Sequence, residues 1–250
     1  MEKVVHKVLA LKYRPKNFKE LIGQDIMVET ITNSIKLNKL PNAYLLTGIR
    51  GVGKTTAARI LAKALNCEQG PAPEPCNECS HCKEIVSGSS IDVFEIDGAT
   101  NRGIEDVRQI IENVRYQPAE CRFKIYIIDE VHQITKDAFN ALLKTLEEPP
   151  PFVKFILATT EPHRLPETIL SRCQQFDFRR ISVRDIAQRL KQVADVEKLR
   201  LTEGALLLIA REGDGSMRDA QTLLEQVLSY SAPESGEWSD VPEVDEHHLH

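Results

Sequence analysis

The stretch Gly48-Ile49-Arg50-Gly51-Val52-Gly53-Lys54-Thr55, followed by Thr56, decides the fold class of this 250-residue chain. Residues 44–47 before it are apolar and predict a short buried strand, and residues 54–66 after it predict a helix with an apolar face. Glycines let backbone N–H groups wrap phosphates, while the lysine reaches the β- and γ-phosphates and the threonine hydroxyl ligates Mg²⁺. A glycine-rich turn is the alternative, but the flanking strand and helix favour a nucleotide-binding P-loop.

Further apolar runs predict the rest of an α/β fold. Strands buried on both faces are expected at 91–96, 123–128 and 153–158, and a weaker one at 174–178. Helical patterns occupy 103–114 and 137–148 between them. Because strands and helices alternate, the pattern predicts a parallel sheet with helices on both faces.

The strands stop at Ser182. Ser182 is followed three residues later by Asp185, and Ser216 by Asp219, which is the pattern of a helix N-cap. An apolar stripe follows the second of these caps. The sequence therefore predicts a separate, small all-helical domain.

Two acidic residues follow the predicted strand at 123–128. Asp129 and Glu130 lie at its carboxyl end, where α/β sheets bind ligands. We assign Asp129 to the Mg²⁺ shell and Glu130 to polarising the attacking water. A surface acid pair that simply ends a strand is the alternative.

Four of the six cysteines cluster in the sequence. Cys67, Cys76, Cys79 and Cys82 have the spacing C-x8-C-x2-C-x2-C, and four thiolates suit tetrahedral Zn²⁺. An iron–sulfur cluster and unligated cysteines are the alternatives. Four protein ligands leave no position for water, so we expect the metal to stabilise an insertion at 67–82 without a catalytic role.

Composition narrows the class of protein. A hydrophobic content of 42% with 28% charged residues is typical of globular domains. No apolar run approaches the roughly 20 residues that span a bilayer, and the N-terminus lacks the features of a secretory signal, so we expect a cytoplasmic protein without membrane contact. Residues 234–250 hold six acids; without them 32 basic residues face 31 acidic ones, so bulk charge gives no evidence for nucleic-acid binding.

Together these features resemble the gamma/tau ATPase subunits of the bacterial DNA polymerase III clamp loader, which are AAA+ proteins. The resemblance runs from about residue 9 to residue 230. Besides the P-loop and the cysteines it rests on Tyr13-Arg-Pro-Lys-Asn-Phe18, Gly23-Gln24, Asp129-Glu-Val-His132, Asn140-Ala-Leu-Leu-Lys-Thr-Leu-Glu-Glu-Pro149, Leu157-Ala-Thr-Thr160, Ser171-Arg-Cys173 and Gly215-Ser-Met-Arg-Asp219.

The resemblance implies an AAA+ P-loop NTPase fold with a five-stranded parallel sheet between helices, a zinc-binding insertion and a helical lid. We expect the ATPase domain over residues 1–179, with the zinc module at 67–82, and the lid over 180–232. Residues 233–250 are expected to be a linker or the truncated start of a third, helical collar domain.

The resemblance also implies roles for single residues. Arg172 is expected to be an arginine finger that acts in trans on a neighbouring subunit's ATP, with Lys144 assisting. Arg218 is expected to be the second sensor, and either Thr159 or Thr160 the first. The expected adenine pocket is Tyr13, Arg14 and Pro15, and the expected DNA contacts are Arg102 and Arg108.

The implied function is that of an ATP-hydrolysing motor subunit that opens and loads a sliding clamp onto primed DNA. It would use ATP, Mg²⁺ and Zn²⁺, with other clamp-loader subunits, the clamp and primer–template DNA as partners in the DNA polymerase III nucleotidyltransferase complex. Two alternatives are a nucleotide-dependent scaffold without turnover and a zinc module that binds nucleic acid alone. Intact Asp129-Glu130 disfavours the first, and the lack of bases and aromatics in 67–82 disfavours the second.

Overall fold

The computed structural model describes residues 8–100, 103–231 and 245. They form two compact units. The sheet unit comprises Lys16–Gly48 and Lys54–Phe178, and the helical unit comprises the described parts of Met1–Pro15, Ile49–Gly53 and Arg179–His250. Among these described residues no helix has both the length and the apolar character that crossing a membrane requires.

The sheet unit contains one five-stranded sheet in the order β2-β3-β4-β1-β5, and every strand pair in it is parallel. Its three central strands are buried along nearly their whole length, which is typical of a sheet covered on both faces. The strands are β1 (Ala43–Thr47), β2 (Val93–Asp97), β3 (Lys124–Asp129), β4 (Val153–Thr159) and β5 (Gln174–Asp177). The predicted five-stranded parallel sheet is thereby confirmed.

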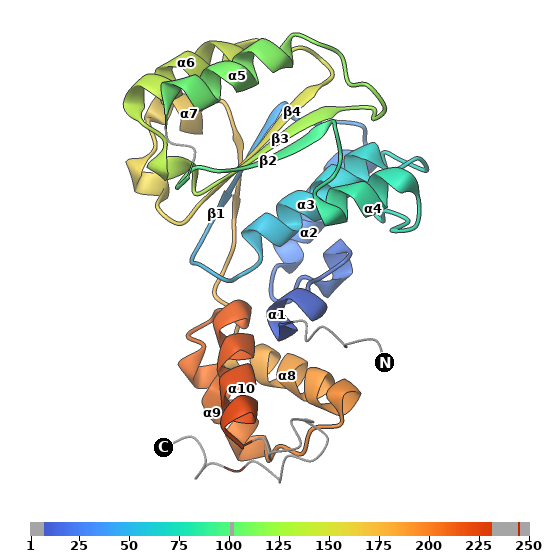
Figure 1. Cartoon of the computed structure of the whole chain (residues 1–250), viewed down its shortest axis with the longest axis vertical. Coiled ribbons are helices and arrows are strands. Elements are labelled where there is room, and N and C mark those ends of the chain that lie inside the picture. The colour runs from blue at the N-terminus through green and yellow to red at the C-terminus, as the bar shows by residue number, and fades with distance from the viewer. Residues whose placement is uncertain (1–7, 101–102, 232–244, 246–250) are drawn as a thin grey trace, which may run out of the picture. The chain divides into compact units, whose positions relative to one another are not determined.

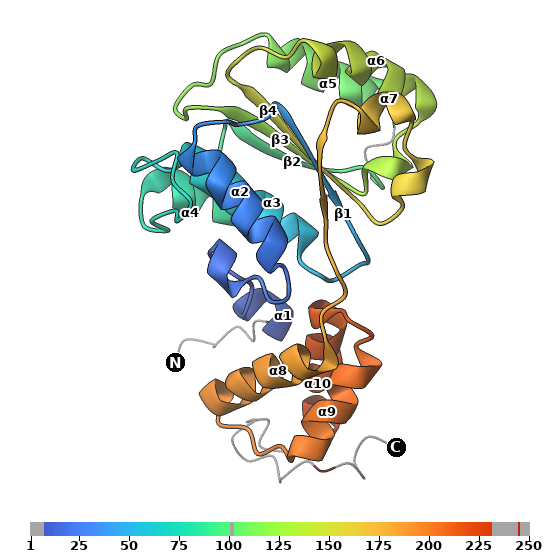
Figure 2. The same ribbon diagram turned by 180° about the vertical axis from the view of Figure 1, so that it is seen from behind.

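Helices cover both faces of this sheet (Figures 1 and 2). One face carries α2 (Asp25–Lys36) and α3 (Lys54–Asn66), with α4 (Ser80–Ser87) packed beside α3. The other carries α5 (Ile104–Val114), α6 (Lys136–Glu147) and α7 (Glu167–Leu170). Short 3-10 turns lie at η1 (Phe18–Glu20), η2 (Val131–Gln133) and η3 (Pro162–Arg164).

The main hydrophobic core lies between the sheet and the layer of α5, α6 and α7. Tyr126 and Phe155 stack in the sheet with their ring centroids 5.5 Å apart. Leu142 of α6 and Ile169 of α7 are fully buried against the same cluster. This packing fixes the carboxyl ends of β3 and β4, which carry the acidic and threonine residues of the predicted site.

The helical unit contains α1 (Leu9–Lys12), α8 (Val183–Glu197), α9 (Glu203–Glu212) and α10 (Met217–Ser231). Both predicted N-caps are confirmed. The Ser182 hydroxyl accepts a hydrogen bond from the Asp185 N–H at 3.1 Å, and the Ser216 hydroxyl accepts one from the Asp219 N–H at 3.2 Å. These caps satisfy backbone donors that a helix start leaves unpaired.

One predicted strand boundary differs from the structure for a physical reason, and one helix was not predicted. The strand expected from residue 91 begins only at Val93, because Asp92 is buried and its carboxylate accepts three backbone N–H groups, those of residues 119–121. Helix α2 was not predicted, although Met27, Ile31 and Ile35 recur every fourth residue on its buried side. The predicted linker at 233–250 lies outside the described residues apart from Asp245.

Candidate functional site

Two glycines of the P-loop occupy positions where no side chain fits. Gly48 has φ +136°, and a Cβ added there would lie 2.5 Å from the Phe178 carbonyl oxygen. Gly51 has φ +78°, and its Cβ would lie 1.9 Å from the Ser216 hydroxyl. Both torsions lie in the region that L side chains rarely adopt. The loop therefore leaves its backbone bare, as close approach to a phosphate requires.

Lys54 begins α3 directly after this loop. It is 6% exposed, and its Nζ donates to the Gly48 carbonyl at 2.7 Å. Burial lowers the pKa of Lys54, while the nearby charges of Glu130 and Asp129 oppose that effect. A buried ammonium held beside bare backbone is a suitable counter-charge for a polyphosphate.

The side chains of Thr55 and Asp129 form a hydrogen bond within the sheet unit. The Thr55 hydroxyl donates to Asp129 Oδ2 at 2.6 Å, although 74 residues separate the two in sequence. Asp129 ends β3, and its other oxygen, Oδ1, accepts the Glu130 N–H at 2.9 Å. The structure thus brings together the two residues that the sequence assigned to Mg²⁺, and a hydroxyl with a carboxylate is a donor pair that this cation accepts.

Glu130 has a left-handed backbone, with φ +44°. Its carboxylate oxygen Oε2 accepts from the Thr160 hydroxyl at 3.0 Å and from the Thr160 N–H at 3.3 Å. The same oxygen lies 3.3 Å from Nδ1 of His132, whose side chain is 2% exposed. Glu130 is therefore held by the residue after β4 and by a buried imidazole.

The two candidate first-sensor threonines have different surroundings. Thr159 is fully buried, and its hydroxyl contacts His132 Nδ1 at 2.9 Å and accepts the Glu161 N–H at 3.0 Å. Thr160 contacts Glu130 directly. Sequence reasoning placed His132 within Asp129-Glu-Val-His132 without giving it a role, and it missed Glu161, whose Oε1 lies 3.2 Å from His132 Nε2. The pairing of adjacent strands brings His132 and Glu161 together, and no local pattern indicates that contact.

Arg172 follows α7 and lies apart from the P-loop contacts described above. Its guanidinium forms an ion pair with Glu147 at the end of α6 and donates to the Thr168 carbonyl at 2.6 Å. Lys144 lies on α6, one turn before Glu147, and is exposed. The contacts of Arg172 are therefore with neighbouring residues of the α6 and α7 segments.

In the helical unit, Arg218 lies next to a P-loop glycine. Its backbone N–H donates to the Gly51 carbonyl at 3.3 Å, and its side chain is exposed. Tyr13 of the predicted adenine pocket donates its hydroxyl to Glu197, and burial together with this bond raises the pKa of Tyr13 to about 12. Arg14 and Pro15 follow in the partly buried segment.

The predicted DNA contacts lack a distinguishing geometry. Arg102 lies outside the described residues. Arg108 is on α5, where its guanidinium pairs with Glu105 at 2.6 Å and both side chains are more than half exposed. This is an ordinary surface ion pair within one helix.

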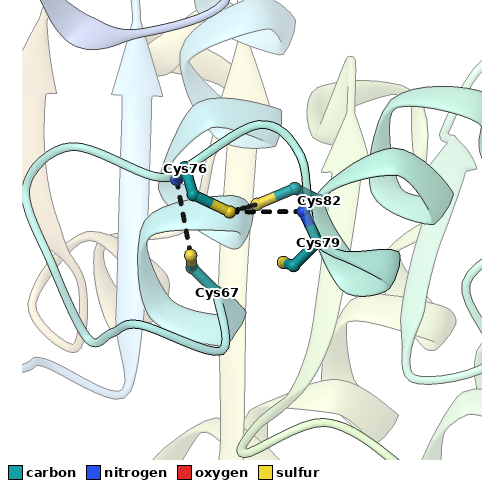
Figure 3. Close-up of side chains that lie close together, drawn as sticks. All are labelled: Cys67, Cys76, Cys79 and Cys82. Atoms are coloured by element: carbon teal, nitrogen blue, oxygen red, sulfur yellow. Dashed lines mark hydrogen bonds between the residues drawn. The ribbon is translucent and has the colours of Figure 1, made fainter.

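The four predicted metal ligands converge on one point (Figure 3). The sulfur atoms of Cys67, Cys76, Cys79 and Cys82 all lie within 4.8 Å of one another. The sulfurs of Cys76 and Cys82 are 3.9 Å apart, close to the roughly 3.8 Å that tetrahedral zinc imposes at a Zn–S length of about 2.3 Å. Cys121 and Cys173 lie outside this cluster, and burial raises the pKa of each thiol to about 11.

Backbone groups around the cluster favour thiolate at Cys76. The N–H groups of Glu78 and Cys79 donate to its sulfur at 3.5 and 3.3 Å, and these bonds lower the pKa of Cys76 to about 6. His81, in contrast, directs Nδ1 to the Asn66 carbonyl at 3.0 Å and is not part of the cluster. The donor set is therefore four sulfurs, which is a common structural zinc set.

The sequence matches two known family models. The sequence model described as DNA polymerase III, delta subunit, matches residues 23–182, and that described as DNA polymerase III clamp loader subunit, ATPase lid domain, matches residues 185–233. The chain belongs to the DNA polymerase III clamp-loader family. The resemblance inferred from the sequence motifs is confirmed.

Individual relatives in this family agree. The chain is 52% identical over 219 residues to DNA polymerase III subunit tau of Bacillus subtilis, covering 88% of this chain and 39% of that protein. It is 47% identical over 224 residues to subunit tau of Escherichia coli, covering 90% of this chain and 35% of that protein. The chain thus spans little more than a third of the length of these relatives.

A solved structure supports the fold. The Thermotoga maritima RuvB Holliday junction branch migration motor aligns with a TM-score of 0.65 at 22% identity, covering 87% of this chain and 65% of that one. At this identity the likeness concerns the fold alone. Together with the parallel sheet order and the lid match, it confirms the predicted AAA+ class of α/β fold.

Proposed function

We propose that this chain is an ATP-hydrolysing motor subunit of a cytoplasmic DNA polymerase III clamp loader. ATP binding and hydrolysis drive the opening of a sliding clamp and its placement on primed DNA. The observation that carries this proposal is the convergence of Thr55, Asp129, Glu130 and Thr160 at the carboxyl ends of β3 and β4. A scaffold without turnover needs no such arrangement of acid and hydroxyl groups.

The residues present fit a nucleotide with its magnesium ion. Gly48 and Gly51 have torsions and close neighbours that exclude a side chain, and Lys54 supplies a buried positive charge beside Gly48. Thr55 and Asp129 would hold Mg²⁺, and the remaining P-loop residues Ile49, Arg50, Val52, Gly53 and Thr56 complete the phosphate-binding segment. When bound, the ion neutralises charge on the transferring phosphoryl group.

In the proposed mechanism, each residue of the chain has one task. Lys54 balances charge on the β- and γ-phosphates, and Glu130 orients and polarises the attacking water. The Thr160 hydroxyl holds the Glu130 carboxylate at 3.0 Å, which makes Thr160 the stronger candidate for the first sensor. Arg218 acts as the second sensor from the lid, and Tyr13, Arg14 and Pro15 border the adenine.

We further propose that hydrolysis is completed in trans. Arg172 is exposed beyond α7, and its partner in this chain is Glu147. In an assembly it exchanges that carboxylate for the ATP of a neighbouring subunit, with Lys144 beside it. Residues 1–179 then act as the ATPase domain and 180–232 as its lid, with 233–250 as a linker.

The cysteine cluster is proposed to hold one Zn²⁺ as a structural ion. Four sulfurs within 4.8 Å of one another suit that ion, and all four positions are taken by protein. DNA binding is proposed to involve Arg108 together with Arg102. The partners of the assembly are the other clamp-loader subunits, the clamp and primer–template DNA.

Steady-state ATP hydrolysis tests the proposal. The chain is measured alone and then with the remaining clamp-loader subunits, clamp and primed DNA. Glu130→Gln should keep ATP binding and lower kcat by about 10²–10⁴-fold. Retained clamp loading by this variant would refute the motor role and favour the scaffold.

A matched arginine pair tests the trans assignment. Arg172→Ala should abolish the stimulation by partner subunits while leaving ATP affinity unchanged. Arg115→Ala removes another exposed arginine of the sheet unit, outside any assigned site, and should leave stimulation intact. Equal stimulation of both variants would remove the arginine-finger assignment.

A further inference from the structure

Lys63 is a buried cation that the proposed ATPase mechanism does not use. It lies in α3 with 1% of its surface exposed. Its Nζ donates to the Lys16 carbonyl at 2.6 Å and to the side-chain oxygen of Asn77, both of which are neutral. Among the residues that the structure describes, no carboxylate forms an ion pair with it. Because burying an unpaired charge costs several kcal/mol, its counter-charge needs an explanation.

The neighbours of Lys63 belong to the cysteine cluster. Its carbonyl accepts the Cys67 N–H at 2.7 Å, one helical turn along α3. Asn77, which receives the ammonium, directly follows Cys76 and turns the chain there with φ +62°. Burial lowers the pKa of Lys63, and the nearby charges of Cys82, Glu20 and Cys76 oppose that effect. The buried ammonium therefore contacts the residue next to Cys76, and the Lys63 backbone contacts Cys67.

The cluster carries no cation of its own. Residues 67–82 contain three glutamates and neither lysine nor arginine. A divalent ion with four thiolates has a net charge of about −2. Arg122 approaches through the carbonyls of Leu65 and Cys67, but its side chain is exposed, and Lys83 beside Cys82 is exposed as well. Water screens those two charges far more than it screens Lys63.

We propose that Lys63 is the counter-charge of the metal–thiolate centre, a positioning residue that sets how tightly the four cysteines hold their ion. The inference rests on the zinc site proposed above. The Asn77 carboxamide relays the ammonium to the turn between Cys76 and Cys79, and the Lys16 carbonyl fixes the opposite side. If the Lys63 charge is removed, the negative metal–thiolate centre loses its buried counter-charge. If the metal is removed, the Lys63 ammonium loses the negative centre that it balances.

Metal analysis of the purified chain separates the two claims. Wild type should contain one zinc per chain; a metal-free or iron-containing protein would remove the zinc proposal itself. Given zinc, its dissociation constant is measured by competition with a chromophoric chelator. Lys63→Met should weaken zinc binding by about 10- to 100-fold, the usual effect of losing an outer partner of a metal site.

Three further variants isolate the role of charge. Lys63→Arg restores a cation and should recover most of the affinity. Lys63→Gln keeps a donor for Lys16 and Asn77 but not the charge, so it should bind zinc as weakly as the methionine variant, and it decides the matter if that variant does not fold. Lys83→Met removes an exposed cation next to a ligand and should leave affinity unchanged.

Cobalt substitution supplies a readout that a merely structural role does not move. A positive charge near the sulfurs stabilises their electrons, so its removal should lower the energy of the thiolate-to-cobalt charge-transfer band. We expect a red shift in Lys63→Gln and Lys63→Met and none in Lys63→Arg or Lys83→Met. Wild-type affinity and an unshifted band in Lys63→Gln would overturn the inference, because hydrogen bonding alone would then suffice.

Discussion

Replacing Gly48 by alanine is the sharpest test of the P-loop geometry. The new Cβ would lie 2.5 Å from the Phe178 carbonyl oxygen and 2.9 Å from the Phe178 Cβ, and the residue would keep φ +136°. Phe178 cannot move away freely, since its N–H donates to the Thr47 carbonyl at 2.8 Å beside β1. We expect both backbone strain and a steric clash.

Gly88 offers a matched control in the same unit. It also has positive φ, at +75°, but a Cβ added there meets nothing within 4 Å. Gly88→Ala therefore carries only the left-handed strain, about 1–2 kcal/mol. Gly48→Ala adds overpacking, about 1–3 kcal/mol, to a strain of similar size. The difference corresponds to a melting temperature about 2–12 °C lower for Gly48→Ala.

Both variants are compared by thermal unfolding and by binding of a fluorescent ATP analogue. Gly48→Ala should melt below Gly88→Ala and lose nucleotide affinity, because the loop must shift to relieve the clash. Gly88→Ala should bind ATP as wild type does. Equal melting temperatures and equal affinities would refute the argument that the approach of Phe178 requires glycine at position 48.

Three other predictions concern separate contacts. Thr160→Val should lower kcat for ATP hydrolysis by about 10- to 100-fold, because it loses its hydrogen bond to Glu130. Thr159→Val should mainly lower the melting temperature, because the Thr159 hydroxyl contacts His132 and accepts the Glu161 N–H. The reverse pattern in parallel assays would exchange the roles of the two threonines. In the metal-free chain, the pKa of about 6 at Cys76 means that its thiolate forms as the pH rises through 6. Mass spectrometry should therefore find alkylation of Cys76 half-maximal near pH 6, and Cys121, with a pKa of about 11, unreactive at pH 8. A midpoint above pH 8 for Cys76 would refute the argument that backbone N–H groups stabilise its thiolate. Asp92→Asn should lower the free energy of unfolding by about 3 kcal/mol, because a neutral carboxamide accepts hydrogen bonds from the three backbone N–H groups less well than a carboxylate does. Thermal unfolding measures this change, and an unchanged melting temperature would refute the argument.

Much of the sheet unit was predictable because its signals are local. Largely apolar runs such as Val153–Thr159 and the glycine pattern before Lys54 need no knowledge of distant residues. The N-caps at Ser182 and Ser216 are equally local. The cysteine spacing predicted convergence because a metal requires it, and the four sulfurs do lie together.

What the sequence could not indicate depends on contacts between distant segments. From the sequence alone, Lys63 is a polar residue on a helix. Its ammonium contacts Lys16, which precedes it in the chain, and Asn77, which follows it. The bond between Thr160 and Glu130 requires β3 and β4 to be neighbours, which strand order decides. Asp92 gave no local sign that it would bind a loop 27 residues later.

Helix α3 joins the P-loop to the cysteine cluster, since Lys54 is its first residue and Cys67 follows its last. At 1.5 Å per residue its 13 residues span about 20 Å, and each residue turns the helix by about 100°. One inserted residue between Ala57 and Ala62 would therefore swing Lys63 and Cys67 out of their places while the P-loop stayed fixed. Substitutions are tolerable along this stretch wherever volume is kept, but its length is not adjustable. In a library of variants selected for function, single-residue insertions and deletions should be depleted from α3 far more strongly than from the loop at residues 71–75, which lies between Cys67 and Cys76.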